Sequence, residues 1–239
     1  MEIDNKVTLV QHLDELRGCI LKSVVCFVLC SIVVSTSAQS IIAFFAIPVG
    51  KLIFITPQEA FVANVKIALF IGFFISTPFI LYQIWKFISL GLLPKEKRYV
   101  YIFCPISLIF FILGVLFGYF VIVPISMNFL LGFSTDIIIP MITVDKYLSF
   151  LFTLSFSFAL VFQLPIVLIY LTKIGIITPN QLRKRRREAI VVIFVVAAIV
   201  TPPDMVTQIL MAIPLIFLYE IGIIFSKLAY KKKKLIKRF

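Results

Sequence analysis

Two acidic side chains stand out from the other charged residues because each lies among cations. Glu15 lies with Arg17 in a short amphipathic stretch, residues 9–17, and Glu96 lies in the basic sequence 94–98. Such a carboxylate can be a local salt-bridge partner, worth about 0–1 kcal/mol at a wet surface. Alternatively, the two can form an acidic recess that binds an incoming cation, most naturally an arginine held by two parallel hydrogen bonds. The spacing alone leaves both interpretations open.

A second group of polar residues lies inside or beside long apolar runs. Its members are Lys22, Gln163, Thr201, Asp204, Gln208 and Glu220. A polar or ionisable group in lipid is costly and marks a candidate site. Gln163 lies two residues before Pro165, so its amide can also serve only to bond a carbonyl that the proline leaves free. Lys22 lies near the end of its run, where we expect its amine to reach the interface.

The residues of a catalytic or metal site are missing from the sequence. It contains no GxxxxGK[ST] phosphate loop and no HExxH pair, and His12 is the one histidine. The four cysteines form no CxxC pair and fall in or beside apolar runs, where they are expected to be small buried hydrophobes. We therefore expect no enzyme, no metal and no cofactor. The apolar runs carry no continuous chain of acids or histidines, which argues against a proton pump.

Composition identifies the solvent of this chain as lipid. Of its 239 residues, 62% are hydrophobic and 14% are charged, and the mean hydropathy is +1.13. Soluble domains are roughly 45–50% apolar and about 25% charged, so this chain lacks the polar side chains to cover a water-facing surface. The net charge of +12 lies in short clusters between apolar runs, so nucleic acid is not the expected partner. We expect one membrane domain, residues 1–239, without a cleavable targeting segment.

Six apolar runs can be distinguished, and each is expected to be a helix because an open strand cannot satisfy its backbone in hydrocarbon. The expected spans are residues 20–38, 65–84, 99–123, 147–171, 189–200 and 205–225. An even number of spans places both termini on one side. All cations except Lys51, Lys66 and Lys146 fall on that side, including the basic tail 227–239. The positive-inside rule then places both termini in the cytoplasm.

Loop and proline patterns refine these helices. Thr56 and Thr178 each precede a proline and are followed three residues later by Glu or Gln, which is typical of a capped helix start. Prolines inside apolar runs should bend their helices and give a concave bundle; they are Pro78, Pro105, Pro165 and Pro214. Gly114 and Gly118 form a GxxxG pair, which is either a packing face or incidental.

The last two expected spans are short. The run 189–200 would be roughly 18 Å long as a helix, against a hydrocarbon core of ~30 Å. The run that starts at Met205 is also short if Glu220 marks its wet end. Such a pair should thin the membrane or leave a water-filled hollow, unless flanking residues simply snorkel.

The string His12-Leu13-Asp14-Glu15-Leu16-Arg17 resembles the amino-terminal signature of TatC, the multispanning receptor subunit of the twin-arginine protein translocase. The resemblance runs nearly end to end and in order. It continues in residues 78–88, 96–98, 119–124, 147–150, 182–184, 201–204, 212–214 and 219–222.

The resemblance implies a membrane receptor that binds twin-arginine signal peptides and helps carry folded proteins across, driven by the proton-motive force. We expect it in a bacterial plasma membrane, and the Phe-, Ile- and Lys-rich composition leaves an organelle inner or thylakoid membrane as the alternative. Single-span subunits of the TatA/TatB type would be its partners in an oligomeric complex, with membrane lipid around it. The signal arginines would be held by Glu15 and Glu96, with Arg17, Phe87 and Arg98 nearby. Polar positions would line the concave face or contact partner helices, and they are Gln163, Thr201, Gln208 and Glu220. Structural positions would be Pro78, Pro165, Asp204 and Pro214.

Three residues depart from the family pattern. Cys19 replaces a basic residue, Leu90 replaces a proline, and Gln163 replaces the glutamate of many bacterial relatives, which removes a titratable group. Two other classes of function remain open at this stage. A small-solute transporter would bind solute near Gln163 or Glu220, and a purely structural anchor would tolerate substitution at every polar intramembrane position.

Overall fold

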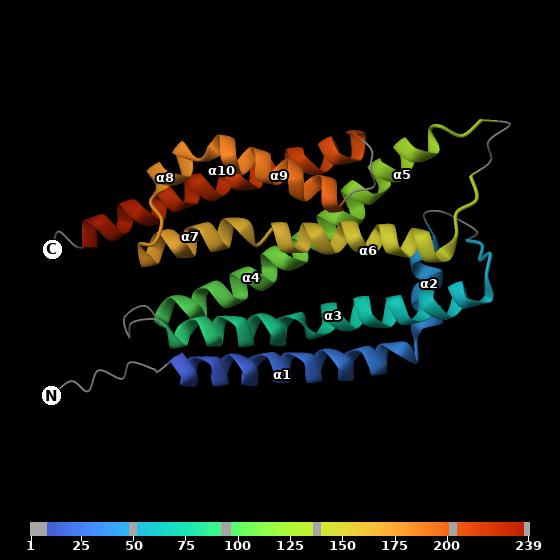
Figure 1. Ribbon diagram of the computed structural model, residues 1–239, viewed down its shortest axis with the longest axis horizontal. Coiled ribbons are helices and arrows are strands. Elements are labelled where there is room, and N and C mark those ends of the chain that lie inside the picture. Colours follow the sequence, from blue (N-terminus) through green and yellow to red (C-terminus); the bar gives the residue numbers. More distant parts are fainter. Residues whose placement is uncertain (1–8, 48–51, 92–96, 136–139, 201–204, 237–239) are drawn as a thin grey trace. The chain divides into compact units, whose positions relative to one another are not determined.

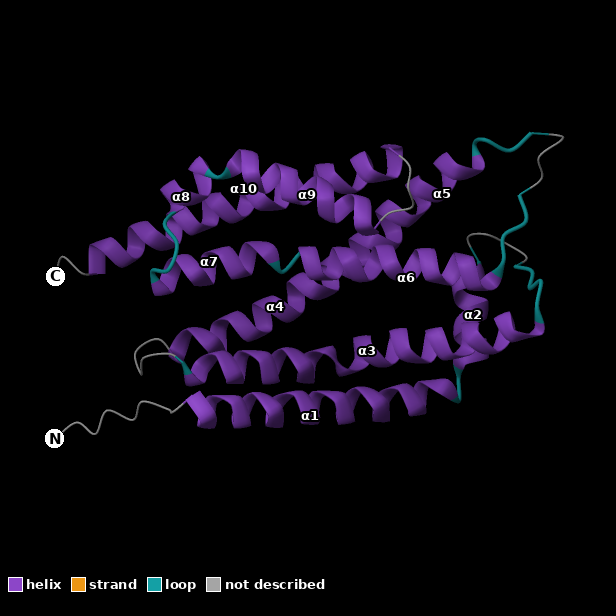
Figure 2. Cartoon of the chain, viewed as in Figure 1, coloured by secondary structure: helices purple, strands orange, loops and turns teal. Residues whose placement is uncertain are grey.

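The computed structural model describes residues 9–47, 52–91, 97–135, 140–200 and 205–236, without the side chains of residues 9–11, 98–99 and 231–236. Helices make up nearly all of this part of the chain (Figures 1 and 2). The helices are α1 (Leu9–Ser35), α2 (Ala38–Ala46), α3 (Pro57–Leu90), α4 (Lys97–Phe117), the π-helix η1 (Gly118–Ile122), α5 (Val123–Leu131), α6 (Val144–Val161), α7 (Leu164–Ile174), α8 (Pro179–Lys184), α9 (Arg186–Val200) and α10 (Met205–Ile236).

Five helical stretches of the described chain are long and apolar enough to cross a membrane. They are His12–Ser35, Pro57–Leu90, Val100–Leu131, Val144–Ile174 and Met205–Tyr230. Each overlaps one of the expected runs. The remaining run, 189–200, forms α9, which has 15 residues and so is short, as the sequence predicts. The protein is therefore an all-helical, multi-pass membrane protein.

The chain divides into two compact units, and the first comprises Met1–Leu108 with Met141–Ser149. Its centre is the pair α1 and α3, which pack side by side (Figure 1). Gly72 permits this close approach, because a Cβ there would overlap the backbone of Ser31. Phe27 and Phe73 meet edge to face beside it, with ring centroids 6.0 Å apart. The two helices thus form a closely packed platform.

In the first part of α3, polar contacts join segments that are distant in sequence. The Lys66 amine donates to Asp145 Oδ1 at 2.5 Å and to Ser149 Oγ at 2.6 Å. The Tyr147 hydroxyl donates to the Phe45 carbonyl at 3.1 Å. These bonds fasten the start of α6 to α3 and α2.

The second unit comprises Ile109–Pro140 with Phe150–Phe239, and α10 packs in it against α7, α8 and α9. Gly222 of α10 lies against Leu168 and Pro165, where a Cβ would be crowded. Gly114 and Gly118 lie equally close to α6: a Cβ on Gly114 would come 2.6 Å from the Phe158 carbonyl oxygen. The GxxxG pair is therefore a packing face, which settles the alternative that the sequence left open.

Several helix boundaries differ from the expected ones. The run 99–123 continues through the π-helical turn η1 into α5, which ends at Leu131. Pro124, just after this turn, has no N–H to donate in the α-helical pattern. The run 147–171 is two helices rather than one, since α7 begins anew one residue before Pro165. Residues 38–46 form a separate helix, α2, that the sequence analysis did not predict.

The expectation of a short sixth helix is wrong. α10 has 32 residues and continues past Glu220 into the basic tail as far as Ile236. Glu220 lies inside this helix, and its carboxylate accepts a hydrogen bond from Arg186 at 2.6 Å, so its charge is paired there.

The two predicted helix caps have different outcomes. At Thr178 the full capping box forms, with the Thr178 amide donating to Gln181 Oε1 at 2.8 Å. Thr56 occupies the N-cap position of α3, but its side chain makes no capping bond. Glu59 accepts instead from the amide of Ile55, one residue before the cap, at 3.2 Å. The prediction of a capping box at Thr56 is therefore wrong.

Candidate functional site

The candidate site begins where the first turns of α1 meet the last turns of α3. His12 of α1 stacks on Phe87 of α3, with ring centroids 4.5 Å apart and planes inclined by 30°. The contact places the amino-terminal signature motif next to the sequence that precedes the basic loop. Phe87 is half-buried, and His12 covers one face of its ring.

Glu15 follows His12 by three residues, so it lies on the adjacent part of the same helix face. Its side chain is exposed, and it makes no ion pair within the described residues. The carboxylate is thus open to solvent beside an aromatic contact. A carboxylate in this state can accept two parallel hydrogen bonds from a guanidinium.

The other residues expected at this site are placed less fully. Arg17 is exposed, and because it is two positions from Glu15 it points from a different side of α1. Arg98 lies in α4, but its side chain falls outside the described structure. Glu96 lies outside the described residues altogether. Of the five expected residues, the structure locates three side chains, and it joins Phe87 to the helix that carries Glu15.

The expected intramembrane polar residues have local partners. Glu220 accepts from Arg186 Nη2 at 2.6 Å, with side-chain exposures of 37% and 44%. Gln208 Nε2 donates to the Phe194 carbonyl of α9 at 3.2 Å. Both contacts tie α10 to α9, so these two polar groups hold the last helices of the chain together.

Gln163 and the expected prolines mark helix breaks and interior positions. Gln163 is the N-cap residue of α7, half-buried, at the break before Pro165. Pro78 and Pro214 lie inside α3 and α10, which continue through them. Thr201 and Asp204, expected in the link before α10, lie outside the described residues.

The basic segment before α9 is anchored by backbone and side-chain contacts. The Thr178 capping box fixes the start of α8, and the Tyr219 hydroxyl of α10 donates to the Leu182 carbonyl at 2.9 Å. Arg183 and Lys184 remain exposed. These contacts hold the cationic segment of α8 against α10, and the charges of Arg183 and Lys184 face outward.

Sequence reasoning missed two features of this architecture. The charge pattern places Lys66 only on the less basic side and does not predict that its amine binds Asp145 and Ser149. His12 was dismissed as a lone histidine, although it stacks on Phe87. The contact of Lys66 could have been expected, because an isolated lysine in an apolar run needs a partner for its charge. Among the described residues, no group of three His, Cys, Asp or Glu side chains could hold a metal ion.

Comparison with known proteins is consistent with this geometry. Residues 11–214 match the family model described as "Sec-independent protein translocase protein (TatC)". The TatC proteins of Carboxydothermus hydrogenoformans and Aquifex aeolicus are 40% and 42% identical over 235 and 241 residues, covering 96% of this chain and 97% and 99% of the relatives. The crystal structure of the "Twin Arginine Translocase Receptor- TatC" superposes with a TM-score of 0.83 at 41% identity, covering 91% of this chain and 99% of that one.

Proposed function

Since this chain belongs to the TatC family of Sec-independent protein translocases, we propose that it is the receptor subunit of a twin-arginine translocation system. It binds twin-arginine signal peptides at the cytoplasmic face of the bacterial plasma membrane and helps transport folded proteins across it. Transport draws on the proton-motive force. The family consists of transport components and not of catalytic enzymes, so the chemistry of the site is recognition.

The observation that carries the proposal is the state of Glu15. Its exposed carboxylate has no ion pair within the described structure and lies one helical turn from the stacked rings of His12 and Phe87. An acid already locked to a neighbouring cation would have to break that pair before it could bind a guanidinium. Glu15 carries no such cost, and Glu96 supplies the second carboxylate of the acidic recess. Arg17, Phe87 and Arg98 complete the signal-binding surface.

The proposed complex includes single-span subunits of the TatA/TatB type. The family name implies a Tat complex with further subunits. The polar residues Gln163, Thr201, Gln208 and Glu220 line the inner face of the bundle or contact partner helices. In support, Gln208 and Glu220 lie on α10 and are only partly buried, so each keeps surface that a partner helix can reach.

The proposed architecture is a single domain, residues 1–239, of six membrane spans with both termini in the cytoplasm and a concave inner face. The fifth span in chain order, which brings the total to six, is supplied by α9, and its side chains support this. Exposed positions on α9 are apolar along most of its length, including Val191 at 63%, Val195 at 53% and Ile199 at 78%. Such a surface requires lipid rather than water around it.

Capture of a signal peptide tests the proposed function. A photo-crosslinker is placed at Lys97, beside the proposed recess, and the full chain in membranes is exposed to a twin-arginine peptide. We expect Glu15→Gln with Glu96→Gln to reduce capture to the level of a peptide that carries two lysines. The reason is that a glutamine cannot supply the charge-assisted, bidentate acceptor that an arginine recognises.

The matched control for this experiment is Asp14→Asn. Asp14 is an exposed acid next to Glu15 on the same helix, so the substitution removes the same single charge as Glu15→Gln from the same region. Capture by this variant should equal that of the unsubstituted chain. Undiminished capture by the Glu15/Glu96 double variant would contradict the acidic recess, whereas an equal loss in both variants would show that only the local net charge matters.

A further inference from the structure

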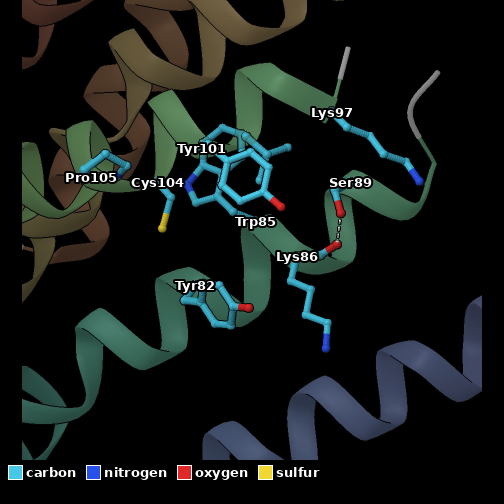
Figure 3. A pocket seen from close by; sticks show the side chains of 9 residues that line it. Tyr82, Trp85, Lys86, Ser89, Lys97, Tyr101, Cys104 and Pro105 are labelled. Carbon is cyan, nitrogen blue, oxygen red and sulfur yellow. Dashed lines mark hydrogen bonds between the residues drawn. The ribbon is translucent and has the colours of Figure 1, made fainter. Parts of the chain in front are cut away.

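A cavity lies between the last turns of α3 and the first turns of α4, next to the signal-binding surface but lined by none of its five proposed residues. Its volume is about 230 Å³. The walls are Tyr82 and Trp85 of α3 and Tyr101, Cys104 and Pro105 of α4, and Lys86, Ser89 and Lys97 also line it (Figure 3). All of these residues belong to the first compact unit.

The cavity is polar at one end and apolar at the other. Figure 3 shows Ser89 near the end of α3 and Lys97 at the start of α4, with the Lys86 amine directed to another side of the opening, whereas Cys104 and Pro105 lie deeper along α4. The lining residues that the structure describes include no acid, so the two exposed amines face no carboxylate there. Within the described part of the chain, the polar end therefore presents two amines without a facing carboxylate.

The floor of the cavity is rigid. Trp85 is buried, at 5% exposure, and its ring stacks on Phe103 with centroids 5.6 Å apart. Its indole nitrogen donates to Ser107 Oγ at 2.9 Å. The tryptophan's polar group is thus already bonded, so the face it turns to the cavity is apolar. Tyr82 and Tyr101, exposed by 52% and 81%, flank this face.

From this arrangement we propose that the cavity binds an anionic phospholipid of the surrounding bilayer. Lys86 and Lys97 attract the anionic headgroup, and an acyl chain follows the apolar wall of Tyr82, Trp85 and Cys104 toward Pro105. Basic pockets at the ends of membrane helices favour anionic headgroups over zwitterionic ones. The volume is smaller than a typical site for a drug-sized molecule, so only the headgroup region and the start of one chain lie inside.

The test uses Trp85, which is the one tryptophan in the chain and forms part of the cavity wall. The full chain is reconstituted in phosphatidylcholine nanodiscs with increasing amounts of phosphatidylglycerol or phosphatidylcholine that carries bromine on its acyl chains, which quenches tryptophan fluorescence on contact. We expect half of the fluorescence to be quenched at a mole fraction of phosphatidylglycerol that is lower than that of phosphatidylcholine by a factor on the order of ten to thirty, because two lysines attract the anionic headgroup.

Charge variants complete the experiment. Lys86→Gln with Lys97→Gln should remove the preference for the anionic lipid, while Arg183→Gln with Lys184→Gln, which removes two exposed cations elsewhere, should retain it. Equal quenching by both lipids in the unsubstituted chain would overturn the proposal. So would an equal loss in the two double variants, or relief of quenching by excess inorganic phosphate, since the cavity would then take the phosphate group alone.

Discussion

Ion pairing divides the described acids of this chain into two kinds. Asp145 is bound by Lys66, and Glu220 is bound by Arg186 on a neighbouring helix. Lys66, Asp145 and Glu220 are half-buried, where an unpaired charge would be costly. Glu15, in contrast, is exposed and has no ion pair within the described residues. The first two carboxylates stabilise the fold, whereas Glu15 is the acid that we propose binds a signal arginine.

The pair of Arg186 and Glu220 can be tested by exchanging its charges. Glu220→Arg places two guanidinium groups together, so we expect a fall in the melting temperature of the detergent-solubilised protein. Arg186→Glu in the same chain should restore most of it. The coupling free energy from the double-mutant cycle should be about 1 kcal/mol, because both side chains are partly solvated.

Arg185 and Glu188 provide the control for this exchange. Their charged atoms are 4.0 Å apart and the side chains are 76% and 72% exposed. The same exchange there should give no measurable coupling. A coupling as large as that of Arg186 and Glu220 would mean that the general charge of the α8–α9 region, and not the specific contact, determines stability.

At the scale of helices, similar sequence signals have different structural results. Pro78 lies inside the continuous helix α3, whereas Pro165 lies just after the interruption between the helices α6 and α7. Pro124 follows the π-turn η1. Likewise, the motifs at Thr56 and Thr178 are alike, but only Thr178 forms a capping box. The sequence predicts that a proline or a cap is present, because these effects are local. The packing neighbours decide whether the helix bends, breaks or continues.

For the candidate site, too, the sequence predicts the local chemistry but not the long-range packing. The chemistry of Glu15 follows from its residue type and its cationic surroundings. The stacking of His12 on Phe87 does not, because the two residues are 75 positions apart and become neighbours only when α1 packs on α3. The bond between Lys66 and Asp145, 79 positions apart, was hidden for the same reason. Long-range packing leaves no local pattern in a sequence of mostly apolar residues.

The packing of α4 on α6 predicts the effect of substitutions at glycine. Gly114→Ala should lower the free energy of unfolding by roughly 1–3 kcal/mol, because its Cβ would overlap the backbone of Phe158 and Ala159. Thermal unfolding in detergent measures this.

Gly18→Ala is the matched control, since no atom lies within 4 Å of the added Cβ. It should be neutral or should stabilise α1 by up to about 1 kcal/mol through helix propensity. Equal destabilisation at both positions would show that the loss does not come from contact with α6.

At the scale of the whole chain, the length of α9 determines how the membrane must adapt. Its 15 residues correspond to roughly 22 Å at about 1.5 Å per residue. A hydrocarbon core is ~30 Å thick, so a spanning α9 requires local thinning or a wet hollow at one end. The adjoining α10 is not short, so this mismatch is confined to α9.

The six-span arrangement predicts which side of the membrane each end of the chain occupies. In a chain without its native cysteines, Leu13→Cys and Tyr230→Cys should both react with an impermeant thiol reagent from the cytoplasmic side. Phe133→Cys, after the third span, should react from the opposite side. These three side chains are exposed, by 63%, 40% and 65%. Labelling of positions 13 and 230 from opposite sides would mean that α9 does not cross the membrane.

The π-turn at Gly118–Ile122 gives this helix an unusual sensitivity to chain length. A π-turn accommodates one residue more than an α-helical turn, so everything beyond it is rotated by about 100° relative to a continuous helix. Removal of a single residue within 119–122 would restore regular winding and redirect Val123–Leu131 toward different neighbours. A one-codon deletion there would thus act as a rotary adjustment of the outer segment, leaving the Gly114 contact with α6 in place.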